Sequence, residues 1–276
     1  MNNQNSILLI DPKFDPITSI NCNLLLKLGM DCFSYAIIDK ALNKVIAVFD
    51  EQECEDMSKV LIERLKNDVY LGLTFNEIKI AVYTENNVSI PNELYKSEDL
   101  KLSAHFFKEK HVGILYTNVS SDFGFTSVFS YAKLTDEIIT QSLSNSKKYH
   151  LNTPILKLAG QIDHTSLLLD FTAGSVSILY IKDKQVVFQQ CYEISDAEEF
   201  TYYLLLIVNQ FNISLTETTV YCCGIIHQED EKYNCLKTYF INVLFLNFVD
   251  YNLDQQVLED MPTHYYTTLL TLDQCV

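Results

Sequence analysis

The sequence predicts an α/β protein built of two similar lobes, and three observations support this fold class. Short apolar runs alternate with amphipathic stretches, which indicates strands interleaved with helices. The order of these segments is the same in the two halves of the 276-residue chain. Apolar residues make up 48% of the sequence and include 17 Tyr and 16 Phe, a composition typical of a folded protein with a large core.

The first half is expected to begin with an edge strand and a turn-rich DPKFDP segment at 11–16. Further strands are expected at 23–28, 33–39, 44–50, 78–84, 111–117 and 123–131. The acidic run 50–56 opens a helix that continues to 65, because acidic residues suit the positive end of the helix dipole. Other helices are expected at 92–105, 135–144 and 152–160.

The second half is organised around residues 166–192, which are expected to form three short strands. A helix at 196–211, a strand at 219–224, a helix ending near 239 and a strand at 243–249 follow. A last helix, opened by Pro262, is expected to pack back on the first lobe. The predicted boundary between the lobes divides the chain into residues 1–150 and 151–276.

The two halves align at an offset of 143 residues. Leu24-Leu25-Leu26 falls on Leu167-Leu168-Leu169, and the strand at 33–38 falls on 176–181 without a gap. A repeat of this length is far longer than a solenoid unit. It predicts two lobes with the element order βββαβαβ, each a mixed sheet made of an antiparallel meander followed by parallel strands.

Charge excludes several classes of partner. The formal net charge is −16, and Arg64 is the one arginine among the 20 basic residues. Nucleic acid and anionic membrane surfaces are therefore not expected as partners, since phosphate recognition relies on Arg and clustered Lys. The N-terminal segment lacks a basic start, and no apolar run is long enough to span a membrane. The eight Cys, which lack paired spacing, predict reduced thiols in a cytoplasmic protein.

The βββαβαβ repeat resembles the superfamily that includes actin, Hsp70 and the sugar kinases, whose lobes are ribonuclease H-like. Within it, the chain resembles an uncharacterised bacterial family of actin-like ATPase fold. The segments that carry this resemblance are DPKFDP, GMDCFSYAIID and LLLDFTAGSVSILYI. It implies two lobes that face each other across a cleft, with ATP and Mg²⁺ held by one hairpin turn from each lobe.

The first hairpin matches the motif implied by this resemblance only in part. Its turn would carry Asp-x-Gly, but Lys27 stands at the Asp position, while Gly29 is kept. A lysine can meet a phosphate as a point charge, yet it cannot coordinate Mg²⁺. The alternative interpretation is an exposed lysine on a lobe that has lost catalysis.

The second hairpin fits the motif better. A small Asp/Thr/Gly/Ser turn can wrap backbone N–H groups around an anion, and Asp170, Thr172, Gly174 and Ser175 form such a turn. Thr172 replaces a Gly, so its Cβ crowds the position where a phosphate would approach. An ordinary hairpin loop is the alternative. The Gly-Gly expected near the adenosine is represented by Gly224 alone, because a Cys precedes it.

These departures predict a degenerate nucleotide site. The leading hypothesis is a non-enzymatic, cytoplasmic pseudo-ATPase with a protein-interaction role, with no catalytic or metal-binding residues assigned. The alternative is an ATP/ADP-binding protein or weak Mg²⁺-dependent ATPase, in which Asp170, Thr172, Gly174 and Gly29 hold the phosphates and Lys27 replaces part of the role of the metal. The partner protein is not identified by the sequence, and a monomer or dimer is expected.

Overall fold

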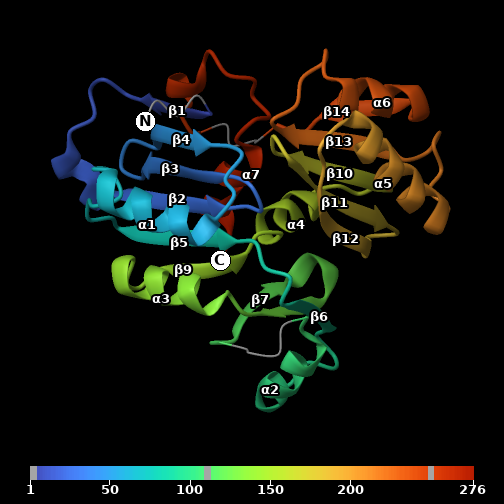
Figure 1. Ribbon diagram of the computed structural model, residues 1–276, viewed down its shortest axis with the longest axis horizontal. Helices are drawn as coiled ribbons and strands as arrows, with labels where there is room; N and C mark the ends of the chain where they lie inside the picture. The colour runs from blue at the N-terminus through green and yellow to red at the C-terminus, as the bar shows by residue number, and fades with distance from the viewer. Residues whose placement is uncertain (1–4, 109–112, 248–251) are drawn as a thin grey trace.

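Two mixed β-sheets form the two lobes, and a third, smaller sheet is attached to the first lobe (Figure 1). The computed structural model describes residues 5–108, 113–247 and 252–276. The two-lobed mixed α/β architecture confirms the predicted fold class.

The first sheet has six strands in the order β1-β4-β3-β2-β5-β9. Its strands are β1 (Ser6–Ile10), β2 (Cys22–Leu28), β3 (Phe33–Asp39), β4 (Lys44–Glu51), β5 (Glu77–Val82) and β9 (Lys147–His150). The predicted edge strand β1 pairs antiparallel with β4, whereas β2 runs parallel to β5. Helices α1 (Met57–Asn67) and α3 (Lys133–Ser142) pack on one face.

The second sheet has five strands in the order β12-β11-β10-β13-β14. They are β10 (Ser166–Phe171), β11 (Ser175–Lys182), β12 (Gln185–Glu193), β13 (Thr219–Gly224) and β14 (Asn242–Phe245). Helices α5 (Ala197–Gln210) and α6 (Glu231–Tyr239) cover one face, and α4 (Thr153–Ala159) covers the other. The order of β12 to β14 is the order of β4, β3, β2, β5 and β9 in the first sheet.

The central strands are buried on both faces, which explains their continuous apolar runs. Leu24 and Leu26 belong to the core under α1 and α3, while Leu25 faces the opposite side. On that side it packs with Leu269 and Leu270 of α7 (Thr267–Thr271). The C-terminal helix therefore packs on the first lobe, as predicted. A strand covered on both faces needs no polar alternation.

Residues 87–131 differ from the prediction because they contain the strands of a third sheet. Its strands β6 (Asn87–Pro91), β8 (Phe125–Phe129) and β7 (Tyr116–Ser120) lie between β5 and α3 in the sequence. The predicted helix at 92–105 is wrong: the helical part is the four-residue α2 (Leu100–Ser103), flanked by 3₁₀ turns. Leu94, Leu102 and Phe106 are exposed there, so a longer helix would have no apolar face to bury.

Several other boundaries differ from the prediction. The helix expected to open in the acidic run 50–56 begins only at Met57, because β4 continues to Glu51. The strand predicted at 111–117 begins at Tyr116, and residues 111–112 lie outside the described part. The strand predicted at 243–249 ends at Phe245, with residues 248–249 again outside it. The C-terminal helix is α-helical only from Thr267, although Pro262 does begin the turn that precedes it.

Candidate functional site

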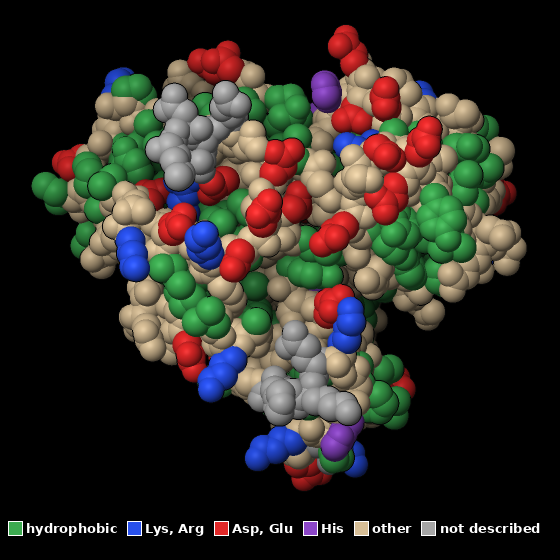
Figure 2. Space-filling view, viewed as in Figure 1, with side chains coloured by type: hydrophobic (Ala, Val, Ile, Leu, Met, Phe, Trp, Pro, Cys, Tyr) green, Lys and Arg blue, Asp and Glu red, His purple; other side chains and the backbone are tan. Residues whose placement is uncertain are grey.

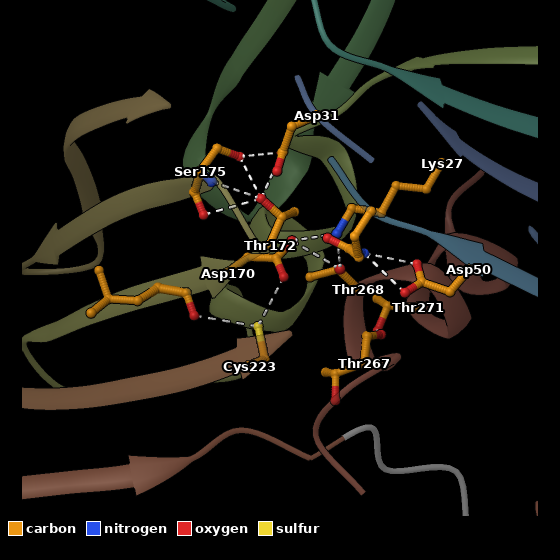
Figure 3. A network of polar contacts seen from close by, with 12 residues as sticks. Lys27, Asp31, Asp50, Asp170, Thr172, Ser175, Cys223, Thr267, Thr268 and Thr271 are labelled. Carbon is orange, nitrogen blue, oxygen red and sulfur yellow. Dashed lines mark hydrogen bonds and ion pairs between the residues drawn. The ribbon is translucent and has the colours of Figure 1, made fainter. Parts of the chain in front are cut away.

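Two hairpin turns face each other where the lobes meet. The first joins β2 to β3 and carries Asp31; the second joins β10 to β11 and carries Thr172 (Figure 3). In the first turn, the Gly29 N–H donates to the Cys32 carbonyl at 2.8 Å. A Cβ at Gly29 would lie 2.5 Å from Cys32 Sγ, so close packing within the turn, without any ligand, already favours glycine there.

Lys27 crosses the interface between the lobes and forms an ion pair with Asp170. Its Nζ lies 2.7 Å from Asp170 Oδ2, and the two side chains are 12% and 7% exposed. Thr268 of α7 completes the contact: its hydroxyl accepts from Lys27 Nζ at 2.9 Å and donates to Asp170 Oδ2 at 3.0 Å. The interpretation of Lys27 as an exposed lysine is therefore wrong, because the facing carboxylate holds it inside the cleft.

The electrostatics of this pair follow from burial and proximity. Burial alone would lower the pKa of Lys27, but the adjacent Asp170 carboxylate outweighs it and the pKa rises. Burial also raises the pKa of Cys223, whose thiol lies 3.7 Å from Asp170 Oδ1. Lys27 is thus a cation at neutral pH, and Cys223 is a neutral thiol.

A carboxylate of the first lobe occupies the second hairpin turn. Asp31 accepts hydrogen bonds from the Gly174 N–H at 2.7 Å and from the hydroxyls of Thr172 and Ser175 at 2.6 and 2.9 Å. The Ser175 N–H donates to Thr172 Oγ1 at 2.9 Å, so the turn itself is also closed. The backbone and hydroxyl groups predicted to hold a phosphate therefore hold a carboxylate of the same chain.

Gln52 extends this contact beyond the turn. Its Oε1 accepts from the Ala173 N–H at 3.0 Å, and its Nε2 donates to both oxygens of Asp50 at 3.0 and 2.9 Å. Asp50 is buried, which raises its pKa. Gln52, which follows β4, thus contacts the second hairpin and is itself held by Asp50 of β4.

Gly224 is held by the C-terminal segment. Its N–H donates to the His264 carbonyl at 3.0 Å, and its φ of 79° lies in the left-handed region. A Cβ here would lie 2.1 Å from the Phe171 carbonyl oxygen and 2.7 Å from Asp170 Oδ1. The close approach of β10 therefore accounts for this glycine without a nucleoside.

Little space remains between the predicted site residues. The cavity lined by Lys27, Thr172 and Gly224 has a volume of about 20 Å³. A water molecule needs roughly 10–15 Å³, whereas pockets for small ligands have about 300–1,000 Å³. In this arrangement of the lobes, the space is close to the volume of one water molecule and far smaller than a pocket for a small ligand.

The structure brings together nearly all the residues singled out in the sequence. Lys27 and Asp170 lie in one group of contacts, and Thr172, Gly174 and Ser175 lie in a second group around Asp31. Gly29 belongs to the first turn, and Gly224 lies against Asp170. Sequence reasoning missed Asp31, Gln52 and Thr268 as members of these contacts. The position of Asp31 in the first turn was visible, but its reach across the cleft depends on how the lobes pack. Within the described ranges, no three His, Cys, Asp or Glu side chains gather as a metal site would require.

Comparison with known proteins identifies the fold. A protein of actin-like ATPase fold and unknown function from Bacteroides thetaiotaomicron is 16% identical, with a TM-score of 0.72 over 89% of this chain and 97% of that one. One chain of the structure of the PilM–PilN type IV pilus biogenesis complex is 11% identical, with a TM-score of 0.60 over 91% of this chain and 97% of that one. EutJ, an ethanolamine utilization protein from Carboxydothermus hydrogenoformans, is 9% identical, with a TM-score of 0.51 over 97% and 93%.

These likenesses show that the chain has the actin-like ATPase fold. A family model described as "Protein of unknown function (DUF3822)" matches residues 11–243. No curated protein matches the chain. Within the residues that the structure describes, no helix has the length and apolar character needed to cross a membrane.

Proposed function

We propose that this chain, which belongs to the DUF3822 family of proteins of unknown function, is a non-enzymatic protein-binding scaffold that keeps the actin-like fold without a working nucleotide site. The observation that carries the proposal is the ion pair of Lys27 with Asp170. It places a side-chain cation where the resemblance implies a metal-binding carboxylate, and it joins the two lobes directly.

Charge requirements support this assignment. Phosphoryl transfer depends on metal ions and cationic groups that neutralise charge along the phosphate chain. Here the cation Lys27 is neutralised by Asp170, and the second turn already binds the Asp31 carboxylate. A nucleotide would have to displace both contacts before it could bind, and the first hairpin would still carry Lys27 at the position where the resemblance implies a carboxylate for Mg²⁺.

A protein-interaction role is supported by one of the similar structures. That structure is a complex of two proteins, PilM and PilN, so the fold occurs there in a protein assembly. We assign a role of the same class, binding to another protein, to this chain, and we place it in the cytoplasm. The partner is expected to be a protein and not a nucleic acid, because acidic residues outnumber basic ones by 36 to 20.

Calorimetric titration with Mg²⁺-ATP and with Mg²⁺-ADP tests the proposal. We expect no heat of binding at millimolar nucleotide and no rise in melting temperature. A ligand at 100 times its Kd would stabilise the fold by about 2.7 kcal/mol, an effect that is easily measured. Binding that is present in the wild type and lost in Asp170→Ala would contradict the proposal.

A second candidate function is nucleotide binding in an open arrangement of the lobes. It is favoured by one observation: the Thr172–Ser175 turn offers a backbone N–H and two hydroxyls to the anionic Asp31. Titration of Asp31→Asn with Mg²⁺-ATP tests this candidate. Binding by this variant, with none by Asp31→Asn/Asp170→Ala, would favour it, whereas no binding by either would exclude it.

A further inference from the structure

A second cavity lies away from the interface of the two hairpin turns, between β12 and the inserted sheet. It has a volume of about 480 Å³ and is lined on one side by residues 186–191 of β12. It is also lined by Asn87 and Ser89 of β6, together with Tyr83, Glu85, Lys108 and His150. Figure 1 shows β12 at the margin of the second lobe that faces the inserted sheet. We call this cavity the β12–β6 groove.

Both strands that border the groove are edge strands. β12 ends the order β12-β11-β10-β13-β14, and β6 ends the order β6-β8-β7. Among the residues that the structure describes, each therefore has one side without a neighbouring strand in its own sheet. An exposed strand edge presents backbone N–H and C=O groups that can pair with an added strand. β12 has nine residues, enough to pair with an extended segment of five or six.

Two buried polar atoms among the lining residues lack a partner. Within the described part of the chain, neither Asn87 Oδ1 nor Gln189 Nε2 forms a hydrogen bond. Unpaired buried polar groups are uncommon in folded proteins and call for an explanation. One is an acceptor and the other a donor, and a peptide main chain carries both complementary groups. Both residues are half-buried overall and line the groove.

Charge indicates which extended segment would bind. Among the lining residues, Glu85 and Lys108 form an ion pair at 2.6 Å, whereas Glu193 at the end of β12 is exposed. Figure 2 shows many acidic side chains on the face where the lobes meet, and the whole chain carries a net charge of −16. Basic residues that flank the bound segment would be attracted by the net negative charge of the whole chain, which would speed association.

We propose that the β12–β6 groove binds an extended segment of a partner protein, which adds as a strand to the β12 edge and carries Lys or Arg beside its paired residues. This inference rests on the proposed protein-binding function and names the surface that performs it. It does not involve Lys27, Asp31 or Asp170, so nucleotide titration and peptide binding test separate parts of the molecule.

The test uses a phage-displayed library of random dodecapeptides, selected on the full-length chain. Synthetic versions of the enriched peptides are titrated by fluorescence anisotropy at low and high salt. We expect the selected peptides to contain Lys or Arg, to bind more weakly as salt is raised, and to slow amide hydrogen exchange at residues 186–191. Absence of enrichment, or protection confined to other segments, would overturn the proposal.

Variants at exposed positions localise the binding site without disturbing the core. Ser89→Arg and Gln190→Arg place a long side chain in the groove from either strand. Each has a matched control outside the groove: Thr117→Arg on β7 and Gln185→Arg at the start of β12, both at exposed positions. We expect the groove variants to weaken peptide binding at least tenfold and the controls to change it less than twofold.

Equal effects of groove and control variants would overturn the proposed site. Sedimentation tests the other candidate for the groove, which is a second copy of the chain. A dimer that Gln190→Arg dissociates but Gln185→Arg does not would assign the groove to self-association, and the proposed partner segment would then be wrong. If ATP binds and the peptide result also holds, the scaffold proposal fails while the groove assignment stands.

Discussion

Lys27 Nζ lies 2.7 Å from Asp170 Oδ2, and these two residues occupy the same position in the two hairpins, 143 residues apart in the sequence. The contact of Asp31 with the Gly174 N–H also joins positions separated by 143 residues. Equivalent positions therefore meet where the two hairpins face each other. A carboxylate at both would place two like charges within hydrogen-bond distance, which requires a cation between them. A lysine at one position removes that requirement.

Removal of the Lys27 charge is expected to destabilise the protein strongly. Lys27→Met leaves the Asp170 carboxylate buried with Thr268 as its remaining hydrogen-bond donor at Oδ2. Loss of one partner of a buried pair costs about 3–5 kcal/mol, whereas replacement of both partners is far milder. The free energy of unfolding in urea, followed by circular dichroism, should fall by this amount in Lys27→Met and recover in Lys27→Met/Asp170→Asn.

Lys133→Met provides the control for this measurement. It breaks the exposed i,i+4 pair with Glu137, whose side chains lie 3.8 Å apart. Such pairs contribute about 0.3–0.5 kcal/mol. Equal losses in Lys27→Met and Lys133→Met would show that the pair between the lobes does not form in solution.

Replacement by alanine should affect stability differently at two glycines with positive φ. Gly224 has a φ of 79° and Gly124 a φ of 68°, so both substitutions introduce the left-handed strain of about 1–2 kcal/mol. At Gly124 no atom lies within 4 Å of the added Cβ, but at Gly224 the Phe171 carbonyl oxygen lies 2.1 Å away. We expect Gly124→Ala to lower the free energy of unfolding by little more than the cost of this strain. Gly224→Ala should lower it by several kcal/mol or prevent folding. Similar melting temperatures would contradict the close approach of β10.

The central part of each lobe could be predicted because local patterns determine it. The apolar runs at 23–28 and 166–171 have no polar alternation, which is typical of strands buried on both faces, and the turns between strands contain the expected small residues. The 143-residue offset placed Lys27 opposite Asp170 in the alignment, although it does not say that the two side chains touch.

The inserted sheet and the contacts across the cleft could not be predicted in the same way. Residues 92–105 have helix-forming composition, but Leu94 and Leu102 find no core to pack on, so tertiary packing overrides the local preference. Asp31, Gln52 and Thr268 lie on three separate segments, and only the packing of the lobes and of α7 brings them to the second hairpin.

Replacement of Asp31 should loosen the second hairpin turn. Asp31→Ala leaves the Gly174 N–H and the two hydroxyls without their anionic acceptor, and hydrogen bonds to a charged group contribute about 1.5–3 kcal/mol each. Because the contributions of these bonds are not additive, we expect the free energy of unfolding to fall by about 2–4 kcal/mol in total. Amide hydrogen exchange at residues 173–175 should accelerate. The control Glu229→Ala changes an exposed acidic residue, and equal exchange in both variants would rule out this role for Asp31.

The free energy of unfolding should decrease as the pH is lowered, because His150 titrates. Its ring is buried between two backbone groups: Nε2 lies 3.1 Å from the Thr84 carbonyl oxygen and Nδ1 accepts from the Asn152 N–H at 3.2 Å. Burial lowers the pKa of His150 from 6.5 to about 4. The unfolded chain therefore takes up the proton first as pH falls. The stabilisation is complete above pH 6.5 and is lost between pH 6.5 and 4.

The difference between these two pKa values corresponds to about 3 kcal/mol at most. Carboxylates also titrate in this range, so the contribution of His150 is measured as a difference between variants. The free energy of unfolding, measured in urea at pH 7.5, 6 and 5, should fall less steeply with decreasing pH in His150→Gln than in the wild type. His105→Gln, at an exposed position, should keep the wild-type slope. A slope that is unchanged in His150→Gln would show that the imidazole is protonated or accessible in the folded state.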